Sequence, residues 1–104
     1  MKQIAPAALA AWLADGSRAK PLLLDVREPW EYQTARIEGS KLVPMGEVAA
    51  RLDELDQGLE LVAICHHGGR SMQVAMFLEK NGFSKVHNLA GGVDAWSKSV
   101  DASE

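Results

Sequence analysis

The single cysteine of this chain lies in a short polar segment that could hold a reactive sulfur. It follows the apolar run 59–64 and precedes a helical pattern over 71–81, so it stands in a strand-to-helix turn. Backbone N–H groups at the start of a helix are unpaired and carry partial positive charge, which favours an anion there. The segment consists of Cys65, His66, His67, Gly68, Gly69, Arg70 and Ser71.

This position favours the ionised form of the thiol. The thiolate is the reactive form of cysteine, and its pKa falls from about 8.5 to roughly 3.5–7.5 beside a helix N-terminus or a cation. Arg70 is a permanent cation with a planar set of donors, and the two glycines let the backbone curl closely around the sulfur. The two histidines add charge at mildly acid pH. We expect Cys65 to be a nucleophile; the alternative is a small hydrophobic residue that ends a strand.

A Cys-His-His triplet also suggests metal ligands. Neighbours in sequence, however, do not all turn toward one ion, and His87 is the only other histidine. Tetrahedral zinc takes four protein ligands, or three and a water molecule, at workable spacing. We therefore expect no metal site at residues 65–67, and the chemistry of a cysteine nucleophile requires no cofactor.

The elements that would position the loop alternate between apolar runs and helical patterns. Because apolar strands that alternate with helices indicate a mostly parallel sheet covered on both faces, we expect an α/β fold. Sites in such sheets lie beyond the carboxyl ends of the strands, where the cysteine stands. Strands are predicted at 2–4, 22–26, 42–43, 59–64 and 85–89, and helices at 6–14, around 28–32, and at 45–55, 71–81 and 93–96.

Aromatic and glycine residues are assigned structural roles. Trp12, Trp30 and Trp96 each lie in a short helical segment beside other apolar residues, which favours core packing over a binding platform. The run 74–78 is apolar throughout and predicts deep burial of the helix after the loop. The glycine pair 91–92 is predicted to form a tight turn for conformational reasons.

Composition limits the classes of partner. The chain has 104 residues, 47% of them hydrophobic and 24% charged, as in one compact domain. A net charge of -3 with dispersed acidic residues argues against nucleic acid, and no stretch is long enough to cross a membrane. A lone cysteine forms no internal disulfide and fits a reducing, cytoplasmic location. We predict a single domain over 1–98 and a polar C-terminal tail over 99–104.

Four motifs, in this order, resemble the rhodanese family of sulfurtransferases. The resemblance covers nearly the whole chain and implies a five-stranded parallel sheet with helices on both faces. It also implies a cysteine that takes a sulfane sulfur from a small donor such as thiosulfate or another persulfide. The persulfide then passes its sulfur to cyanide, a thiol or a protein acceptor. The motifs are LDVREPWEY at 24–32, IEGS at 37–40, CHHGGRS at 65–71 and GGVDAW at 91–96.

The resemblance assigns roles to the loop residues. Cys65 is the nucleophile, and the backbone amides of 66–70 form a cradle for the persulfide. Arg70 would also attract an anionic donor. Ser71 could cap the following helix or form a hydrogen bond within the loop.

Three residues outside the loop are expected to support it rather than to contact sulfur. Asp25 and Arg27 resemble the family's acidic and basic pair at a strand end. Glu31 lies one helical turn after Arg27, a spacing that permits an ion pair. Arg36 departs from the family, which often has histidine before the Ile-x-Gly motif, and it is either a solvated charge or a source of positive potential near the cleft.

Loop length separates two chemistries. Related cell-cycle phosphatases have five residues between cysteine and arginine, whereas this chain has four, 66–69. A shorter loop suits one sulfur atom better than a phosphate group, so sulfur transfer is favoured over phosphatase activity. A module that senses sulfide or oxidation, or that binds a protein, is the alternative from another class.

Overall fold

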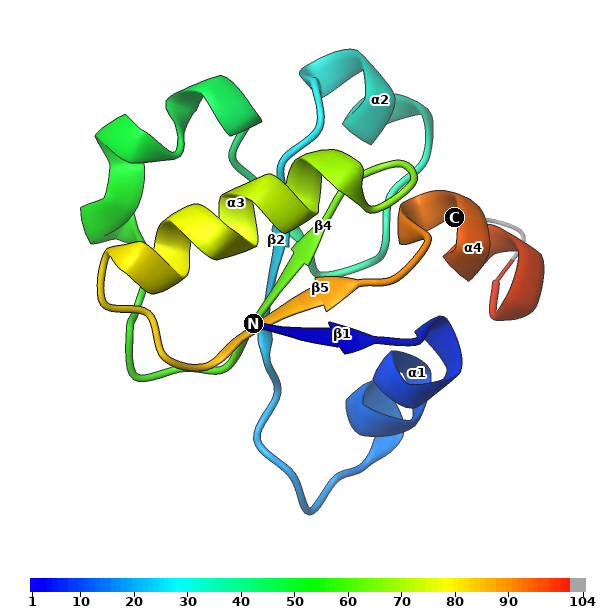
Figure 1. Cartoon of the computed structure of the whole chain (residues 1–104). Helices are drawn as coiled ribbons and strands as arrows, with labels where there is room; N and C mark the ends of the chain where they lie inside the picture. The colour runs from blue at the N-terminus through cyan, green and yellow to red at the C-terminus, as the bar shows by residue number, and fades with distance from the viewer. Residues whose placement is uncertain (102–104) are drawn as a thin grey trace.

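The computed structural model describes residues 1–101, and one parallel sheet organises them (Figure 1). The prediction of an α/β fold with a five-stranded parallel sheet is confirmed. The strand order is β1-β5-β4-β2-β3, and every pair is parallel. The strands are β1 (Lys2–Ile4), β2 (Leu22–Asp25), β3 (Lys41–Leu42), β4 (Leu61–Ile64) and β5 (Val86–Leu89).

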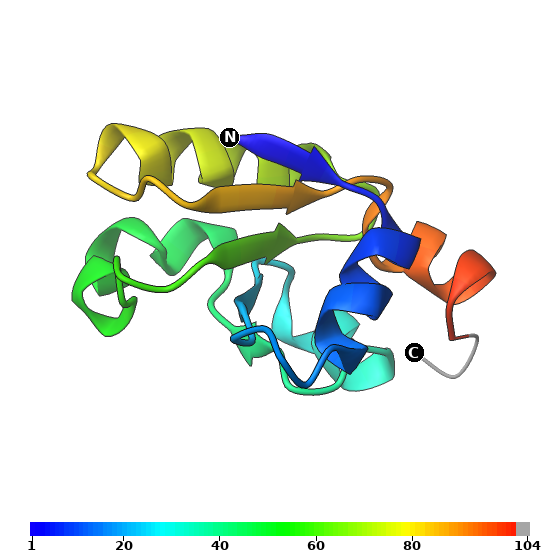
Figure 2. The same cartoon turned by 90° about the horizontal axis from the view of Figure 1, so that it is seen from below.

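Helices cover both faces of this sheet, as predicted. The helices are α1 (Pro6–Ala14), α2 (Pro29–Thr34), α3 (Gly69–Lys80) and α4 (Gly92–Ser99), with 3-10 helices η1 (Met45–Glu47) and η2 (Ala49–Glu54). Helix α3 lies on one face, whereas α1 and α4 lie together on the other (Figures 1 and 2). The alternation of a strand produces this division, because Leu61 and Ala63 of β4 join one core cluster and Val62 and Ile64 the other.

Strand register brings three chain segments to one edge of the sheet. Strands β2 and β4 pair from Leu22 with Leu61 to Asp25 with Ile64, so both end at the same level. Ala63 of β4 pairs with Asn88 of β5, which ends one residue later. The residues after β2, the cysteine loop after β4 and the turn after β5 therefore meet at the carboxyl edge, where sites of parallel sheets are built.

The segment 45–55 was predicted as one helix and is instead two 3-10 helices. Gly46 weakens helix formation at its start, and the backbone of Arg51 leaves helical geometry with a φ of -120°. Val48 and Leu55 still reach the core at 2% and 5% exposure. Of the apolar positions that the helical spacing placed on one face, Leu52 is only partly buried and Ala49 is exposed.

Two predictions of burial hold only in part, since in the apolar run 74–78 only Val74, Ala75 and Leu78 are buried. Trp12 and Trp96 are buried as predicted, but Trp30 is 69% exposed because α2 is a short helix with no buried residue. In α3, Met76 and Phe77 are 48% and 37% exposed, so the apolar run turns only one face to the sheet. A continuous apolar run in a helix cannot all be buried when only one side is covered.

Helix α4 continues to Ser99, three residues past its predicted end at Trp96. The predicted tail at 99–104 thus begins inside a helix, and residues 102–104 lie outside the described part of the chain. The domain limits of 1–98 stay a prediction. Within residues 1–101, no helix is long and apolar enough to span a bilayer.

Candidate active site

The cysteine loop closes around its own sulfur. Cys65 comes directly after β4 and is only 1% exposed. The backbone N–H of Gly68 donates to its Sγ at 3.0 Å, and the Ser71 hydroxyl lies 3.3 Å from the same atom. Gly68 adopts a φ of +102°, a conformation that glycine tolerates and that turns its N–H inward. Helix α3 begins at Gly69, so Ser71 lies in its first turn.

The loop favours the thiolate. Burial raises the pKa of the Cys65 thiol, because charge is costly away from water. Hydrogen bonds from the Ser71 hydroxyl and from the backbone amides of Ser71, Gly68 and His67 act in the opposite direction. Their combined effect is larger, so the pKa of Cys65 lies below its ordinary value. The expected cradle was the backbone amides of 66–70. Residues 67 and 68 of this range donate to the sulfur, and the third backbone donor is Ser71.

Helix α4 anchors the loop from the other side. The Val93 N–H donates to the Cys65 carbonyl at 2.8 Å, and the Asp94 N–H donates to the His66 carbonyl at 3.0 Å. These N–H groups belong to the first turn of α4, where backbone donors have no partner within the helix. Gly92 lies against the same carbonyls with a φ of +62°. The predicted tight turn at 91–92 is therefore also a close approach of two backbones.

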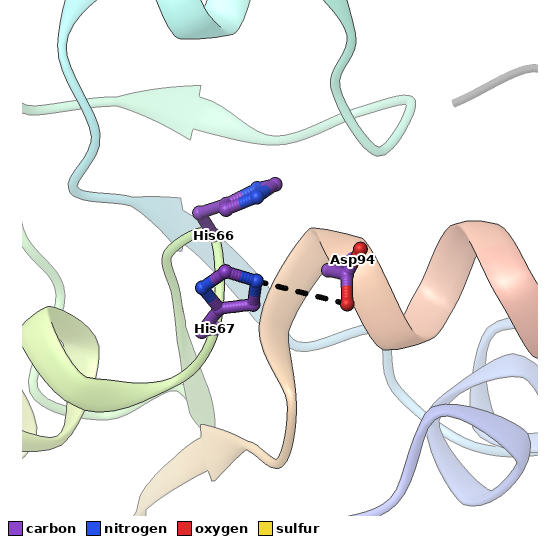
Figure 3. Close-up of side chains that lie close together, drawn as sticks. All are labelled: His66, His67 and Asp94. Atoms are coloured by element: carbon purple, nitrogen blue, oxygen red, sulfur yellow. Dashed lines mark ion pairs between the residues drawn. The ribbon is translucent and has the colours of Figure 1, made fainter.

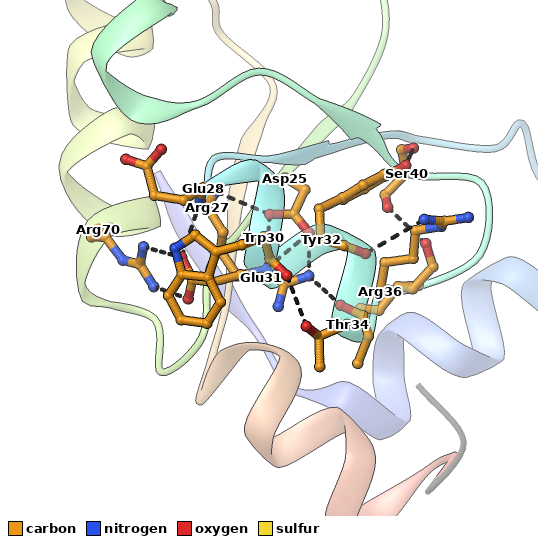
Figure 4. Close-up of polar contacts among 12 residues, drawn as sticks. Asp25, Arg27, Glu28, Trp30, Glu31, Tyr32, Thr34, Arg36, Ser40 and Arg70 are labelled. Atoms are coloured by element: carbon orange, nitrogen blue, oxygen red, sulfur yellow. Dashed lines mark hydrogen bonds and ion pairs between the residues drawn. The ribbon is translucent and has the colours of Figure 1, made fainter.

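Arg70 is tied to Glu31 rather than left free above the loop. Its Nη1 and Nη2 donate to the two Glu31 carboxylate oxygens at 2.7 and 2.8 Å (Figure 4). Sequence spacing permitted an ion pair between Glu31 and Arg27, but the structure pairs Glu31 with Arg70 instead. These two hydrogen bonds link α2 to the first turn of α3, so Glu31 holds the C-terminal end of the cysteine loop in place.

Asp25 and Arg27 pair with each other. They are 0% and 3% exposed, and the Arg27 guanidinium donates to both Asp25 oxygens at 2.8 to 3.1 Å. Arg27 Nη2 also donates to the Ala35 carbonyl at 2.6 Å. The pair fixes the segment after β2 on which α2 stands (Figure 4). Arg36, in contrast, is exposed and lies over the Tyr32 ring, 4.8 Å from its centre.

A cleft of about 310 Å³ opens beside the loop. Trp30 and Thr34 of α2 form one wall, and Asp94 and Ser97 of α4 form the opposite wall. His66 reaches the cleft from the cysteine loop. Sequence analysis missed this role of Trp30, because an aromatic residue in a short helix has the same pattern whether it packs inside or lines a cleft.

His66, His67 and Asp94 gather at the surface of the loop (Figure 3). The centres of the two imidazole rings lie 4.1 Å apart, and one donor atom from each of the three side chains lies within 4.8 Å of the others. Within residues 1–101, these side chains form the group that could approach a metal ion. The Asp94 carboxylate, however, already accepts a hydrogen bond from Lys98 at 3.0 Å. The expected absence of a metal site stays a prediction.

Comparisons with known proteins agree with the observed fold. The family described as Rhodanese-like domain matches residues 6–99, which is most of the chain. The chain belongs to the rhodanese-like family. A Bacillus subtilis relative named putative sulfur carrier protein YrkF is 44% identical over 75 residues, 72% of this chain. An Allochromatium vinosum protein named sulfurtransferase is 34% identical over 77 residues, covering 74% of this chain and 72% of that protein.

A solved structure agrees with the rhodanese-like assignment. A Staphylococcus aureus protein described as a rhodanese-like domain protein has a TM-score of 0.86 and 30% identity. The match covers 92% of this chain and 91% of that one. Some relatives are longer than this chain, which spans 40% of the Bacillus subtilis protein and 28% of an Arabidopsis thaliana chloroplastic relative. The chain thus matches most of the length of this solved chain and less than half the length of these two relatives.

The Glu31–Arg70 pair predicts how the stability of this rhodanese-like domain depends on pH. The hydrogen bond from Arg70 lowers the pKa of Glu31 from 4.5 to about 2. A lowered pKa in the folded state stabilises the fold above pH 4.5, and this stabilisation disappears as the pH falls toward 2. Glu31→Gln should therefore unfold more easily than the wild type at neutral pH.

Urea unfolding at a series of pH values measures this difference. The free energies of unfolding of wild type and Glu31→Gln should converge between pH 4.5 and about 2. Glu38→Gln, which changes an exposed carboxyl at the surface, is the matched control and should show no such convergence. A gap between Glu31→Gln and wild type that is the same at every pH would contradict the assigned ion pair.

Proposed function

We propose that this chain is a sulfurtransferase that carries a sulfane sulfur as a persulfide on Cys65. The donor is thiosulfate or another persulfide, and the acceptor is cyanide or a thiol. The observation that carries the proposal is the ring of donors around the only cysteine, which lowers the pKa of the Cys65 thiol despite its burial. Membership of the rhodanese-like family supports the reaction class.

The proposed cycle has two displacement steps. The Cys65 thiolate attacks the outer sulfur of thiosulfate, the sulfur–sulfur bond of the donor breaks, and sulfite leaves with the bonding pair. The outer sulfur of the new persulfide then carries the negative charge. Cyanide attacks that sulfur, thiocyanate leaves, and the thiolate is restored. Neither step needs an external oxidant, a reductant or a bound cofactor.

The surroundings of the sulfur suit these steps. Backbone N–H groups that already face Sγ can bind a negative charge that lies on it or one atom beyond it. The Arg70 guanidinium contributes a positive charge near the thiolate, and Glu31 fixes its position. The cleft between α2 and α4 offers room next to the loop for the body of an acceptor. In the proposed roles, Cys65 reacts and residues 66–71 hold the persulfide.

The acceptor in a cell is either a small thiol or a protein. Relatives whose names mention a sulfur carrier or a sulfurtransferase make a protein acceptor a reasonable candidate. The exposed rim of the cleft, formed by Trp30 and Thr34, is where we propose that such an acceptor would approach. A screen of small thiols and thiol-bearing proteins that take the sulfur from the loaded chain would identify the class.

Incubation with thiosulfate tests the proposal. Mass spectrometry of the whole protein should show a gain of one sulfur atom, and peptide mapping should place it on Cys65. Cyanide or a small thiol should then remove the sulfur, and thiocyanate should accumulate over many cycles. If Cys65 loads but never unloads with turnover, the sensing alternative replaces the enzyme. If an aryl phosphate is hydrolysed and no sulfur is gained, the reaction is that of a phosphatase.

A further inference from the structure

Asn88 is a polar residue buried in the strand next to the cysteine. It lies on β5 at 1% exposure, and its amide nitrogen donates to the Gly68 carbonyl at 3.1 Å and to the Gln3 side chain at 3.0 Å. A backbone carbonyl can only accept a hydrogen bond, so the nitrogen of Asn88 must face Gly68. This fixes the direction of the amide, and its oxygen therefore faces the Ser71 hydroxyl.

The Ser71 hydroxyl lies near three hydrogen-bond acceptors but can donate to only one of them. Its Oγ contacts the Asn88 carbonyl oxygen, lies 3.3 Å from the Cys65 sulfur and lies 3.3 Å from the Gly68 carbonyl oxygen. A hydroxyl has one hydrogen, and an amide oxygen has none to offer in return. Ser71 is fully buried, so water does not supply the missing donor.

The charge on the sulfur decides where this hydrogen is needed. When Cys65 is a thiol, Ser71 can donate to Asn88 and accept the S–H hydrogen at the same time. When Cys65 is a thiolate, the sulfur becomes an acceptor only and competes with Asn88 for the single hydrogen. A hydrogen bond to an ionised group is roughly twice as strong as a neutral one, so ionisation draws the hydrogen toward the sulfur.

We propose that Asn88 is a positioning residue that controls the direction of the Ser71 hydroxyl hydrogen and, through it, the stability of the Cys65 thiolate. In this arrangement Asn88 restrains ionisation while its amide nitrogen holds the Gly68 carbonyl in place. The inference rests on the proposed function in that Cys65 is the reacting group. The turn of the Ser71 hydroxyl hydrogen from Asn88 toward the sulfur accompanies ionisation of the thiol whether or not sulfur is transferred.

The same arrangement distinguishes the stages of the proposed cycle. In the persulfide the charge lies on the outer sulfur, so Sγ becomes a weak acceptor. The Ser71 hydrogen then returns to Asn88, and the backbone amides bind the charged sulfur alone. The hydrogen bond from Ser71 to the Asn88 oxygen would thus form again each time the cysteine is loaded.

Two substitutions in a double-mutant cycle test this role. Asn88→Leu removes the competing oxygen at similar size, so the pKa of the Cys65 thiol should fall and alkylation below that pKa should be about threefold faster. Ser71→Ala removes the hydroxyl, so the pKa should rise and alkylation should be slower. The double variant should match Ser71→Ala, because Asn88 acts through the hydroxyl. The pH dependence of the alkylation rate reports on the chain's only cysteine.

A purely structural role gives a different pattern. If Asn88 only holds the loop together, Asn88→Leu loosens the amides around the sulfur and raises the pKa of Cys65, with or without Ser71. That result, or no change at all, overturns the proposal. Asn81→Leu makes the same substitution at an exposed helix end and should leave the thiol unchanged.

The wild-type protein provides a second measurement if Asn88→Leu does not fold. The side-chain amide resonances of Asn88 should shift with the midpoint of Cys65 ionisation, and this shift should shrink in Ser71→Ala. Resonances that stay fixed through the thiol titration would overturn the proposal. Both measurements concern ionisation, so they can succeed even if thiosulfate never loads the protein, which separates this inference from the proposed function.

Discussion

Replacing Cys65 with alanine should abolish sulfur loading completely. The residue is the only cysteine, and the attacking atom of the proposed cycle disappears with it. The fold should survive, because the substitution removes one buried atom from a core cluster at a cost of about 1 kcal/mol. Mass spectrometry after thiosulfate treatment measures loading, and thermal unfolding measures the fold.

Cys65→Ser is the matched control for shape. Its hydroxyl can accept the same hydrogen bond from the Gly68 N–H but does not form a persulfide. Both variants should therefore bind no sulfur while keeping the secondary structure of the wild type. A sulfur atom still gained by either folded variant would place the carrier site elsewhere and contradict the proposed nucleophile.

Gly92→Ala should damage both stability and loading. A Cβ at this position would lie 2.2 Å from the Cys65 carbonyl oxygen and 2.5 Å from the His66 carbonyl oxygen, closer than side chains approach backbone. The φ of +62° adds strain of its own. Helix α4 must then move away from the loop that it anchors. We expect a loss of about 3 kcal/mol in the free energy of unfolding, measured by urea titration.

Gly16→Ala is the control for this prediction. No atom lies within 4 Å of the Cβ that it would add, and Gly16 has no positive φ. Its free energy of unfolding should stay within about 0.5 kcal/mol of the wild type, and its loading rate should be unchanged. If Gly92→Ala matched Gly16→Ala in its free energy of unfolding and in its rate of sulfur loading, the close contact between α4 and the cysteine loop would not be what keeps the loop in place.

The fold could be predicted to a large extent from the sequence. The apolar runs located four of the five strands to within two residues, because buried parallel strands need continuous apolar side chains. The edge strand β1 was also predicted, although two of its three residues are polar and exposed. The position of Cys65 at a strand end placed the candidate site at the carboxyl edge of the sheet, where the structure has the cysteine loop. The winding of η1 and η2 could not be predicted, because buried residues at the same spacing fit an α-helix or a 3-10 helix.

The partners of charged residues were harder to predict. Spacing permitted an ion pair between Arg27 and Glu31, yet Arg27 pairs with Asp25, and Glu31 pairs with Arg70, which lies 39 residues away. Such pairs depend on how separate elements pack, and local spacing carries no information about that. Asn88 was also missed. A polar side chain inside an apolar strand was the available signal, since a buried amide requires partners.

Direct titration of the thiol tests the central claim, that the loop stabilises the ionised sulfur of Cys65. Because the chain has one cysteine, the ultraviolet absorbance of the thiolate reports on this residue alone. We predict a midpoint below the ordinary cysteine value of about 8.5 that returns toward that value when the protein is unfolded in urea. A midpoint in the folded protein at or above the value in urea would contradict the account.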